Sequence, residues 1–194
     1  MNIFTKKVFD KKAQKRKSPL LFQKGLSLIE ASMVLALSAI VVSGVMYYYQ
    51  AASDNNKTQS TVSEVMSIVS AVNGLYVGTS NYEGLTNNVI MNTSAIPANY
   101  KDGQNITHPF GGKINIGASQ NDKTKYYILL EDVPRGACVN LASMNFGTSL
   151  AGAGVGKEAQ TKAEQGKLIT KALTPATAAT SCANNTNTIA FQLK

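Results

Sequence analysis

Residues 26–53, LSLIEASMVLALSAIVVSGVMYYYQAAS, decide the fold of this chain. From Ala31 to Ser53 the stretch contains no charged side chain. A helix of about 20 apolar residues crosses the roughly 30 Å hydrocarbon core of a bilayer. Three consecutive tyrosines, beginning at Tyr47, lie near the end of the stretch, and amphipathic rings favour the headgroup region. The stretch therefore predicts a membrane-spanning helix.

A basic segment precedes the apolar stretch. Residues 1–25 contain 8 Lys and Arg side chains against the single acid Asp10, and the remaining residues contain 11 basic and 10 acidic side chains. The formal charge of +8 therefore belongs almost entirely to this segment, which the positive-inside rule places in the cytoplasm. Because the rest of the chain is nearly balanced in charge, we expect no nucleic-acid partner.

A removable secretory signal is an alternative explanation of the apolar stretch. Such signals have a shorter apolar segment, of about 7–15 residues, followed by a cleavage site with small residues. The residues Ala51-Ala52-Ser53 fit such a site. The greater length of the apolar stretch favours a retained helix.

Beyond the apolar stretch, the sequence predicts that the same helix continues as an amphipathic one. Apolar residues recur at steps of three and four, at Val62, Val65, Met66, Val69, Val72 and Tyr76. Polar residues are expected on the opposite face, at Ser63, Glu64, Ser67, Ser70 and Asn73. No proline occurs between Pro19 and Pro97, so one helix is expected over residues 26–78. Gly44 is a candidate point of bending.

From Thr79 onward, short apolar runs separated by Gly, Asn, Ser and Thr predict a globular domain over residues 79–194. Strands are expected at Lys113–Gly117, Tyr126–Glu131, Val139–Met144 and Ile189–Leu193, with a helix over residues 137–145 (ACVNLASMN) as an alternative to the third. Turns or loops are expected at Asn81–Gly84, Lys101–Asn105, Pro109–Gly112 and Ala151–Gly156. Pro175 predicts the start of a short helix within Thr174–Ser181.

The two cysteines, Cys138 and Cys182, are better explained by a disulfide than by a metal site. No other cysteine, and not the single histidine, lies near either of them in the sequence. An exported chain enters an oxidising compartment, where disulfides persist. Closing such a loop would stabilise the fold by about 3–4 kcal/mol through chain entropy.

Glu30 lies near the start of the apolar stretch, where a carboxylate is unfavourable without a partner. No Lys, Arg or His lies between Gly25 and Lys57. One explanation is a capping box, in which Ser27 caps the helix and Glu30 reaches back to the backbone. In the other, cleavage after Gly25 creates an amino group on Leu26 that neutralises Glu30 of a neighbouring chain. The S-x-x-E motif alone favours the capping box.

No pattern in the sequence indicates an enzyme. The single histidine, His108, lies in the segment THPFGG, where a role in a turn is favoured over catalysis or metal binding. Nucleophile-elbow, phosphate-loop and dinucleotide-binding motifs do not occur, and no cluster of acids or histidines indicates a metal. We therefore expect no catalytic residue, no cofactor and no metal.

The string Lys24-Gly25-Leu26-Ser27-Leu28-Ile29-Glu30, between a basic segment and an apolar helix, resembles the class III signal of type IV prepilins. The resemblance implies that a prepilin peptidase cuts between Gly25 and Leu26 and N-methylates Leu26, and that Glu30 orients incoming subunits during assembly. The long leader and a first mature residue other than Phe are more similar to the type IVb branch. Later segments resemble the bundle-forming pilins of that branch: AASDNNKTQS, SAVNGLY, NTSAIPANYKDG, HPFGG, ACVNLASMNFGTS and TPATAATSC.

The resemblance covers essentially everything after residue 24 and implies an α+β type IV pilin fold. In that fold a long N-terminal helix packs on a globular head with an antiparallel β-sheet. Residues 26–52 would form the membrane segment and later the filament core, after removal of residues 1–25. A disulfide between Cys138 and Cys182 would bound the D-region, residues 138–182. We expect the head to diverge from its relatives at Gly147–Thr170.

The function implied is that of the major structural subunit of a type IVb pilus, whose extracellular fibres mediate adhesion, fibre bundling and autoaggregation. The implied partners are further copies of the chain in a helical filament, prepilin peptidase, the inner-membrane assembly machinery, an outer-membrane secretin and a host-cell surface. The precursor would lie in the inner membrane of a Gram-negative bacterium. Two alternatives stay open: a minor pilin or type II secretion pseudopilin, and an uncleaved single-span membrane protein with a periplasmic binding domain.

Overall fold

The computed structural model describes residues 27–169 and 171–194. The chain divides into two compact units, of which the first ends at Gly44 and the second runs from Val45 to Lys194. Helix α1 (Leu28–Leu75) contributes to both units and confirms the predicted long N-terminal helix, although it ends slightly before residue 78. The helix is unbroken at Gly44, so a bend at this residue stays a prediction.

The part of α1 in the first unit is a helix with an exposed apolar surface. Leu35 is 70% exposed and Ile40 is 71% exposed. The hydroxyls of Ser32, Ser38 and Ser43 donate to backbone carbonyls of the preceding turn. The few polar side chains here are therefore satisfied within the helix, as a helix in hydrocarbon requires.

The second unit is built on a six-stranded antiparallel sheet with the order β1-β2-β3-β4-β6-β5. Its strands are β1 (Lys101–Asp102), β2 (Asn105–Thr107), β3 (Lys113–Ala118), β4 (Tyr126–Pro134), β5 (Leu150–Val155) and β6 (Thr186–Leu193). The last strand in the sequence, β6, lies between β4 and β5. The sheet is therefore completed only when the C-terminal segment has inserted.

Four short helices accompany the sheet: α2 (Asn87–Met91), α3 (Arg135–Ala142), α4 (Lys157–Glu164) and α5 (Pro175–Ser181). Two single turns of 3-10 helix, at Ala98–Tyr100 and Gly147–Ser149, complete the described elements. The short helix at Pro175 is confirmed by α5, whose first turn is capped because the Thr174 hydroxyl accepts from the backbone N–H of Thr177. Helices α2 and α4 were not predicted from the sequence.

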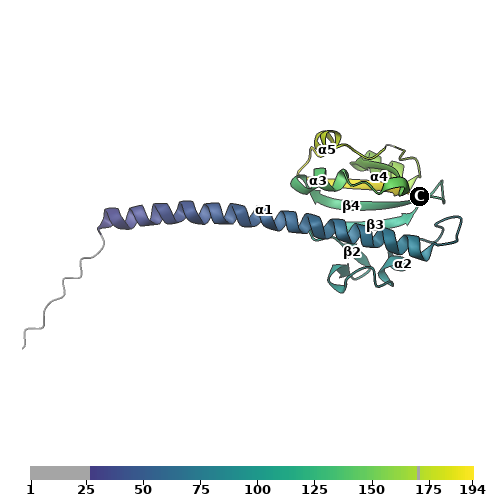
Figure 1. Ribbon diagram of the computed structural model, residues 1–194, viewed down its shortest axis with the longest axis horizontal. Coiled ribbons are helices and arrows are strands. Elements are labelled where there is room, and N and C mark those ends of the chain that lie inside the picture. Colours follow the sequence, from purple (N-terminus) through teal and green to yellow (C-terminus); the bar gives the residue numbers. More distant parts are fainter. Residues whose placement is uncertain (1–26, 170) are drawn as a thin grey trace, which may run out of the picture. The chain divides into compact units, whose positions relative to one another are not determined.

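Side chains of the strands alternate between two faces, and both faces are covered. On one face, apolar side chains of the strands form a single core with α1, α2 and α3, including Ile68, Val72, Ile90, Ile114, Ile128, Leu141 and Phe191. In Figure 1, α1 runs alongside β3 and β4 within this unit. On the other face, Leu129 and Ala190 pack with Ala159 and Ala163 of α4.

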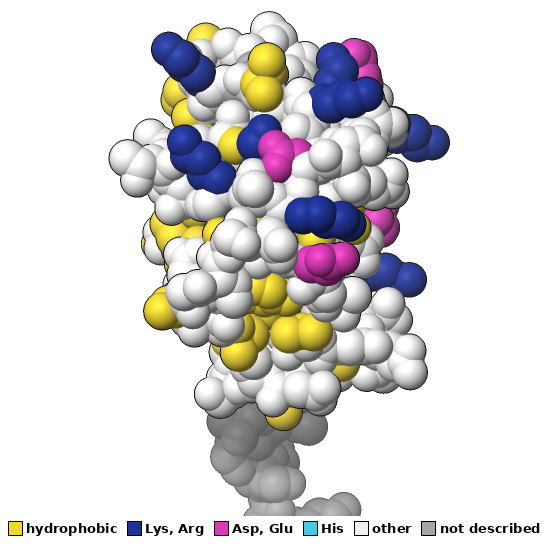
Figure 2. All heavy atoms as spheres, turned by 90° about the vertical axis from the view of Figure 1, so that its right-hand side faces the viewer, with side chains coloured by type: hydrophobic (Ala, Val, Ile, Leu, Met, Phe, Trp, Pro, Cys, Tyr) yellow, Lys and Arg dark blue, Asp and Glu magenta, His cyan; other side chains and the backbone are white. Residues whose placement is uncertain are grey.

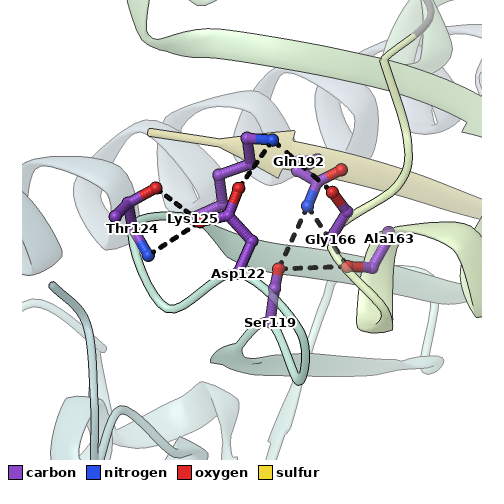
Figure 3. A network of polar contacts seen from close by, with 7 residues as sticks. All are labelled: Ser119, Asp122, Thr124, Lys125, Ala163, Gly166 and Gln192. Carbon is purple, nitrogen blue, oxygen red and sulfur yellow. Dashed lines mark hydrogen bonds and ion pairs between the residues drawn. The ribbon is translucent and has the colours of Figure 1, made fainter.

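The loop between β3 and β4 is tied to the C-terminal end of α4 (Figure 3). The Ser119 hydroxyl donates to the Ala163 carbonyl at 3.1 Å and accepts from Gln192 Nε2 at 3.1 Å. Lys125 Nζ lies 2.8 Å from an Asp122 carboxylate oxygen and 3.5 Å from the Gly166 carbonyl. This network fixes α4 against its face of the sheet.

The expected strand at Val139–Met144 is wrong, and the alternative helix is confirmed in its place. Helix α3 begins at Arg135, directly after Pro134, and ends at Ala142. Its buried residues Cys138, Leu141 and Ala142 follow a helical spacing. The apolar residues of this run are therefore spaced three to four positions apart, as in a helix, and do not alternate every two residues, as in a strand.

The expected loop at Ala151–Gly156 is also wrong, because these residues form most of strand β5. A Cβ atom on Gly152 would lie 2.1 Å from the backbone oxygen of Leu168, and one on Gly154 would lie 2.6 Å from the Ala159 Cβ. The glycines are needed because other segments pass close to the strand. Composition alone made this strand look like a loop.

The remaining predicted elements of the head are largely correct. Strands β3, β4 and β6 contain the runs that were predicted as strands, with somewhat wider bounds for each. The expected turn at Lys101–Asn105 is the tip of a hairpin formed by β1 and β2, with Gly103 at a φ of +59°. No helix or strand occurs at Asn81–Gly84 or Pro109–Gly112, as expected for turns.

Candidate assembly site

The exposed apolar surface of α1 is the first feature suited to assembly. By length and composition, α1 is long and apolar enough to cross a membrane, with a mean hydropathy of 2.1 over its most apolar window. Its large apolar side chains between Leu28 and Tyr49 are all more than half exposed. A surface of this kind is stable only when lipid or other protein covers it.

Glu30 lies in the first turn of α1 and is hydrogen-bonded to its own helix. The backbone N–H of Ser27 donates to Glu30 Oε2 at 3.0 Å, which is the reach-back bond of a capping box. Gly25 and Leu26 lie outside the described residues, so pairing of Glu30 with a Leu26 amino group stays a prediction. The cap leaves Oε1 available, because only one carboxylate oxygen takes part in it.

Cys138 and Cys182 form a disulfide with a Cα–Cα distance of 5.9 Å. Cys138 belongs to α3 and Cys182 follows the last residue of α5, and both side chains are buried in the core. The bond therefore joins the two helices directly. The segment that it closes contains β5, α4 and α5.

The geometry described so far combines an apolar N-terminal helix with a disulfide-bonded α+β head. The profile of the Bundlin family matches residues 50–194, which is well over half of the chain. The chain belongs to the Bundlin family. The resemblance to bundle-forming pilins, noted from sequence motifs, is thereby confirmed.

Two relatives are similar to this chain over most of their length. The protein described as the major structural subunit of bundle-forming pilus from Escherichia coli O111:H- is 50% identical over 185 residues, covering 89% of this chain and 95% of the relative. The protein with the same description from Escherichia coli O127:H6 (strain E2348/69 / EPEC) gives the same identity and coverage. The similarity therefore extends over nearly all of both proteins.

A solved structure supports the fold of this chain independently. The crystal structure of TcpA, a type IV pilin from Vibrio cholerae El Tor biotype, superposes on this chain with a TM-score of 0.50. The superposition covers 72% of this chain and 99% of TcpA. Its sequence identity is 16%, so the likeness concerns the fold alone. The predicted α+β type IV pilin fold is confirmed by this match.

Sequence reasoning missed Glu64 as a site residue. It was predicted on the polar face of the helix, but it is only 4% exposed, whereas Met66, predicted on the apolar face, is 44% exposed. Neither carboxylate oxygen of Glu64 has a hydrogen-bond partner within residues 27–169 and 171–194. Burial raises the pKa of Glu64 to about 8, because the charged form is disfavoured away from water.

A signal for the burial of Glu64 was available in the sequence. The buried residues of α1 are Thr61, Glu64, Val65, Ile68, Val69 and Val72, and they follow steps of three and four. The predicted apolar face omitted Ile68, which is fully buried. Centring the face on Ile68 moves it toward Glu64 and away from Met66.

His108 has the structural role in a turn that was predicted for it. Its side chain is buried, its Nε2 lies 2.7 Å from the Glu131 carbonyl oxygen, and its Nδ1 accepts from the backbone N–H of Phe110. Burial lowers the pKa of His108, which favours the neutral ring. Among the residues that the structure describes, no group of three His, Cys, Asp or Glu side chains is placed to hold a metal.

Proposed function

We propose that this chain is the major structural subunit of a type IVb pilus and acts without catalysis. The observation that carries the proposal is the exposed apolar part of α1 in a chain that also has a disulfide-bonded α+β head. Its membership of the Bundlin family, and its 50% identity to proteins described as major structural subunits of bundle-forming pilus, support it. The extracellular fibres mediate adhesion to a host-cell surface, fibre bundling and autoaggregation.

The precursor waits in the inner membrane of a Gram-negative bacterium. Residues 1–25 are a leader that prepilin peptidase removes between Gly25 and Leu26, and Leu26 is then N-methylated. Residues 26–52 hold the subunit in the lipid, and the head, residues 79–194, lies outside with its disulfide-bounded region 138–182. The basic leader supports this orientation, because cytoplasmic flanks of membrane helices are rich in Lys and Arg.

Fibre formation exchanges one apolar environment for another. The apolar part of α1 leaves the lipid and packs against the same part of other copies, so the hydrophobic effect holds the fibre together. The inner-membrane assembly machinery supplies the energy for extraction, and the fibre leaves through an outer-membrane secretin. Glu30 and the amino group of Leu26 set the register, because a misplaced subunit leaves a charge unpaired in an apolar core.

Isolation of surface fibres tests the proposal. We expect this chain to make up most of the fibre protein and to begin at a methylated Leu26 in N-terminal sequencing. A chain that begins at Met1 and stays in the membrane would support the single-span alternative. A few copies per fibre would support a minor pilin or pseudopilin. Cells without the chain should lose fibres, autoaggregation and adherence together.

Glu30→Ala tests the register mechanism within this function. We expect the variant to be processed after Gly25 but to form no fibres, since the Leu26 amino group of a neighbour would be left unpaired. Glu83→Ala, at an exposed acid of the head, is the matched control and should assemble normally. Electron microscopy and immunoblotting of sheared fibres measure both, and abundant fibres from Glu30→Ala would contradict the pairing.

A further inference from the structure

A groove lies beside Glu64, between α1 and the loop of residues 93–100. Its volume is about 330 Å³, and its lining includes Ser60, Ser63, Ser67, Ala95, Pro97 and Tyr100. Ser67 and Ala95 also border a second hollow of about 520 Å³ further along α1. Small side chains on the α1 side leave room for a long, thin side chain from outside.

Glu64 is one of the residues that line this groove, but its two carboxylate oxygens are closed to solvent and have no donor among the described residues. Two hydroxyls near Glu64 on α1 are bonded elsewhere: Thr61 Oγ1 donates to the Lys57 carbonyl at 2.9 Å, and Ser67 Oγ donates to the Ser63 carbonyl at 2.9 Å. The hydroxyls of Ser60 and Ser63, which also line the groove, make no hydrogen bond to Glu64. A buried polar group without a partner is unfavourable. Such a group is uncommon in a folded protein and points to a partner from another molecule.

The lysine side chains nearest the groove in the sequence contact groups other than Glu64. Lys57, on α1, has its Nζ 5.8 Å from the centre of the Phe110 ring. Lys101, which follows the loop, donates from Nζ to the Met91 carbonyl at 2.7 Å. No Lys or Arg is among the described residues that line the groove. The described part of the chain therefore supplies no cation to Glu64, and a second molecule can supply one.

We propose that the groove receives a lysine side chain from a second copy of this chain, and that Glu64 turns into the groove and pairs with its ammonium group as the fibre forms. This inference rests on the proposed function, which supplies the second copy at high local concentration. It goes further by assigning to the head a charged contact separate from the one at Glu30.

Charge complementarity favours a second copy as the partner. Within the described residues, the ion pairs are Lys125–Asp122 and Lys162–Glu158. Exposed lysines such as Lys113 and Lys167 are in neither of them. Figure 2 shows Lys and Arg side chains spread over one end of the head. Each copy therefore offers cations that are not used within the described part of its own chain.

Protonation makes the contact specific to the assembled state. With its pKa raised to about 8, Glu64 is mostly neutral in the free subunit at neutral pH. An ammonium group that enters the groove favours the carboxylate, and the proton is released to solvent. The long, flexible stem of lysine suits a group held at the wall of a groove. A misaligned neighbour gains no such pair.

Glu64→Gln tests the proposal, because it keeps the shape and removes the charge. We expect the variant to be processed and to unfold at the same temperature as the wild-type subunit at pH 6. Its yield of sheared fibres should fall by at least about tenfold, since the neighbour's ammonium is left without a carboxylate. Glu83→Gln, at an exposed acid, should leave the yield unchanged.

Carbodiimide treatment of wild-type fibres gives a second measurement that does not depend on a variant. Fibres assembled from a mixture of ¹⁴N- and ¹⁵N-labelled chains should yield an amide between Glu64 and a lysine of a differently labelled chain. Glu64→Gln fibres equal to wild type in yield and heat resistance, or fibres with no inter-chain link at Glu64, would overturn the inference. Absence of this chain from wild-type fibres would instead refute the proposed function.

Discussion

The two ends of α1 differ in the exposure of their apolar side chains. Between Leu28 and Tyr49 the large apolar side chains are exposed, whereas Val65, Ile68 and Val72 are fully buried against the sheet. The first part thus carries apolar surface that needs an external partner, and the second part completes the core of its own unit. Helix formation alone therefore does not tell which part serves the fold and which serves assembly.

The two glutamates of α1 differ in the same way. Glu30 is exposed and accepts a hydrogen bond from the backbone of Ser27. Glu64 is buried and has no partner among the described residues. In each case at least one carboxylate oxygen has no hydrogen-bond partner among the described residues, and the apolar surroundings decide how much an unpaired charge would destabilise the arrangement.

The largest expected effect is at the exposed apolar part of α1. Leu37 is 65% exposed, and Leu37→Asp tests this surface. A charge at the centre of a membrane helix costs about 3 kcal/mol, which lowers the partition of the helix into the membrane roughly a hundredfold. We expect loss of membrane retention and of fibres, measured by fractionation and microscopy. Leu37→Met is the control, and fibres from Leu37→Asp at wild-type levels would contradict the comparison.

At the buried part of α1 a truncation should affect stability directly. Ile68→Ala is expected to lower the free energy of unfolding by about 2–5 kcal/mol, because it leaves a cavity in the core. Met66→Ala, two residues earlier and 44% exposed, should change it by less than about 1 kcal/mol. Denaturant unfolding of the detergent-solubilised chain measures both. Equal effects would mean that the two residues do not lie on different faces.

A pH dependence distinguishes the buried acid from the exposed one. The pKa of Glu64 is about 8 in the folded chain against 4.5 as the ordinary value, so the folded state binds more protons between these values. Stability should therefore fall as pH rises through this range, by up to about 1.4 kcal/mol per pH unit. Glu64→Gln should remove the slope, which thermal unfolding in a pH series would show.

His108 acts with the opposite sign and is separable from Glu64. Its pKa is lowered by burial, so the unfolded state binds more protons below about pH 6.5 and stability falls as the pH drops. The range from pH 6.5 to 8 therefore isolates the contribution of Glu64. A wild-type chain whose stability is flat across that range would show that Glu64 is ionised in the folded state.

The smallest effect is expected where the two units meet in the sequence. A Cβ atom at Gly44 would meet nothing within 4 Å, so Gly44→Ala should stabilise the helix locally by about 1 kcal/mol. Amide hydrogen exchange around residue 44 should slow, while the unfolding midpoint of the head should stay the same. Faster exchange in the variant would show that glycine is not the weak point of the helix.

Much of the fold was predictable because its signals are local. The apolar run, the helical steps after it and the absence of proline specify α1, and Pro175 specifies the start of α5. Strands β3, β4 and β6 were also recognised from short apolar runs. Strand β5 was not, because its glycines reflect the approach of Leu168 and Ala159, which lie elsewhere in the sequence.

The sequence by itself determined an apolar N-terminal helix behind a basic segment, an acid near the start of that helix and a pair of cysteines in the domain that follows. These are properties of composition and short-range spacing, so they do not depend on which segments meet. Only the tertiary structure decided that β6 inserts between β4 and β5 and that a groove forms between α1 and residues 95–100 beside Glu64. Both depend on contacts between segments that are distant in the sequence, and the energies of those contacts cannot be inferred from a local sequence pattern.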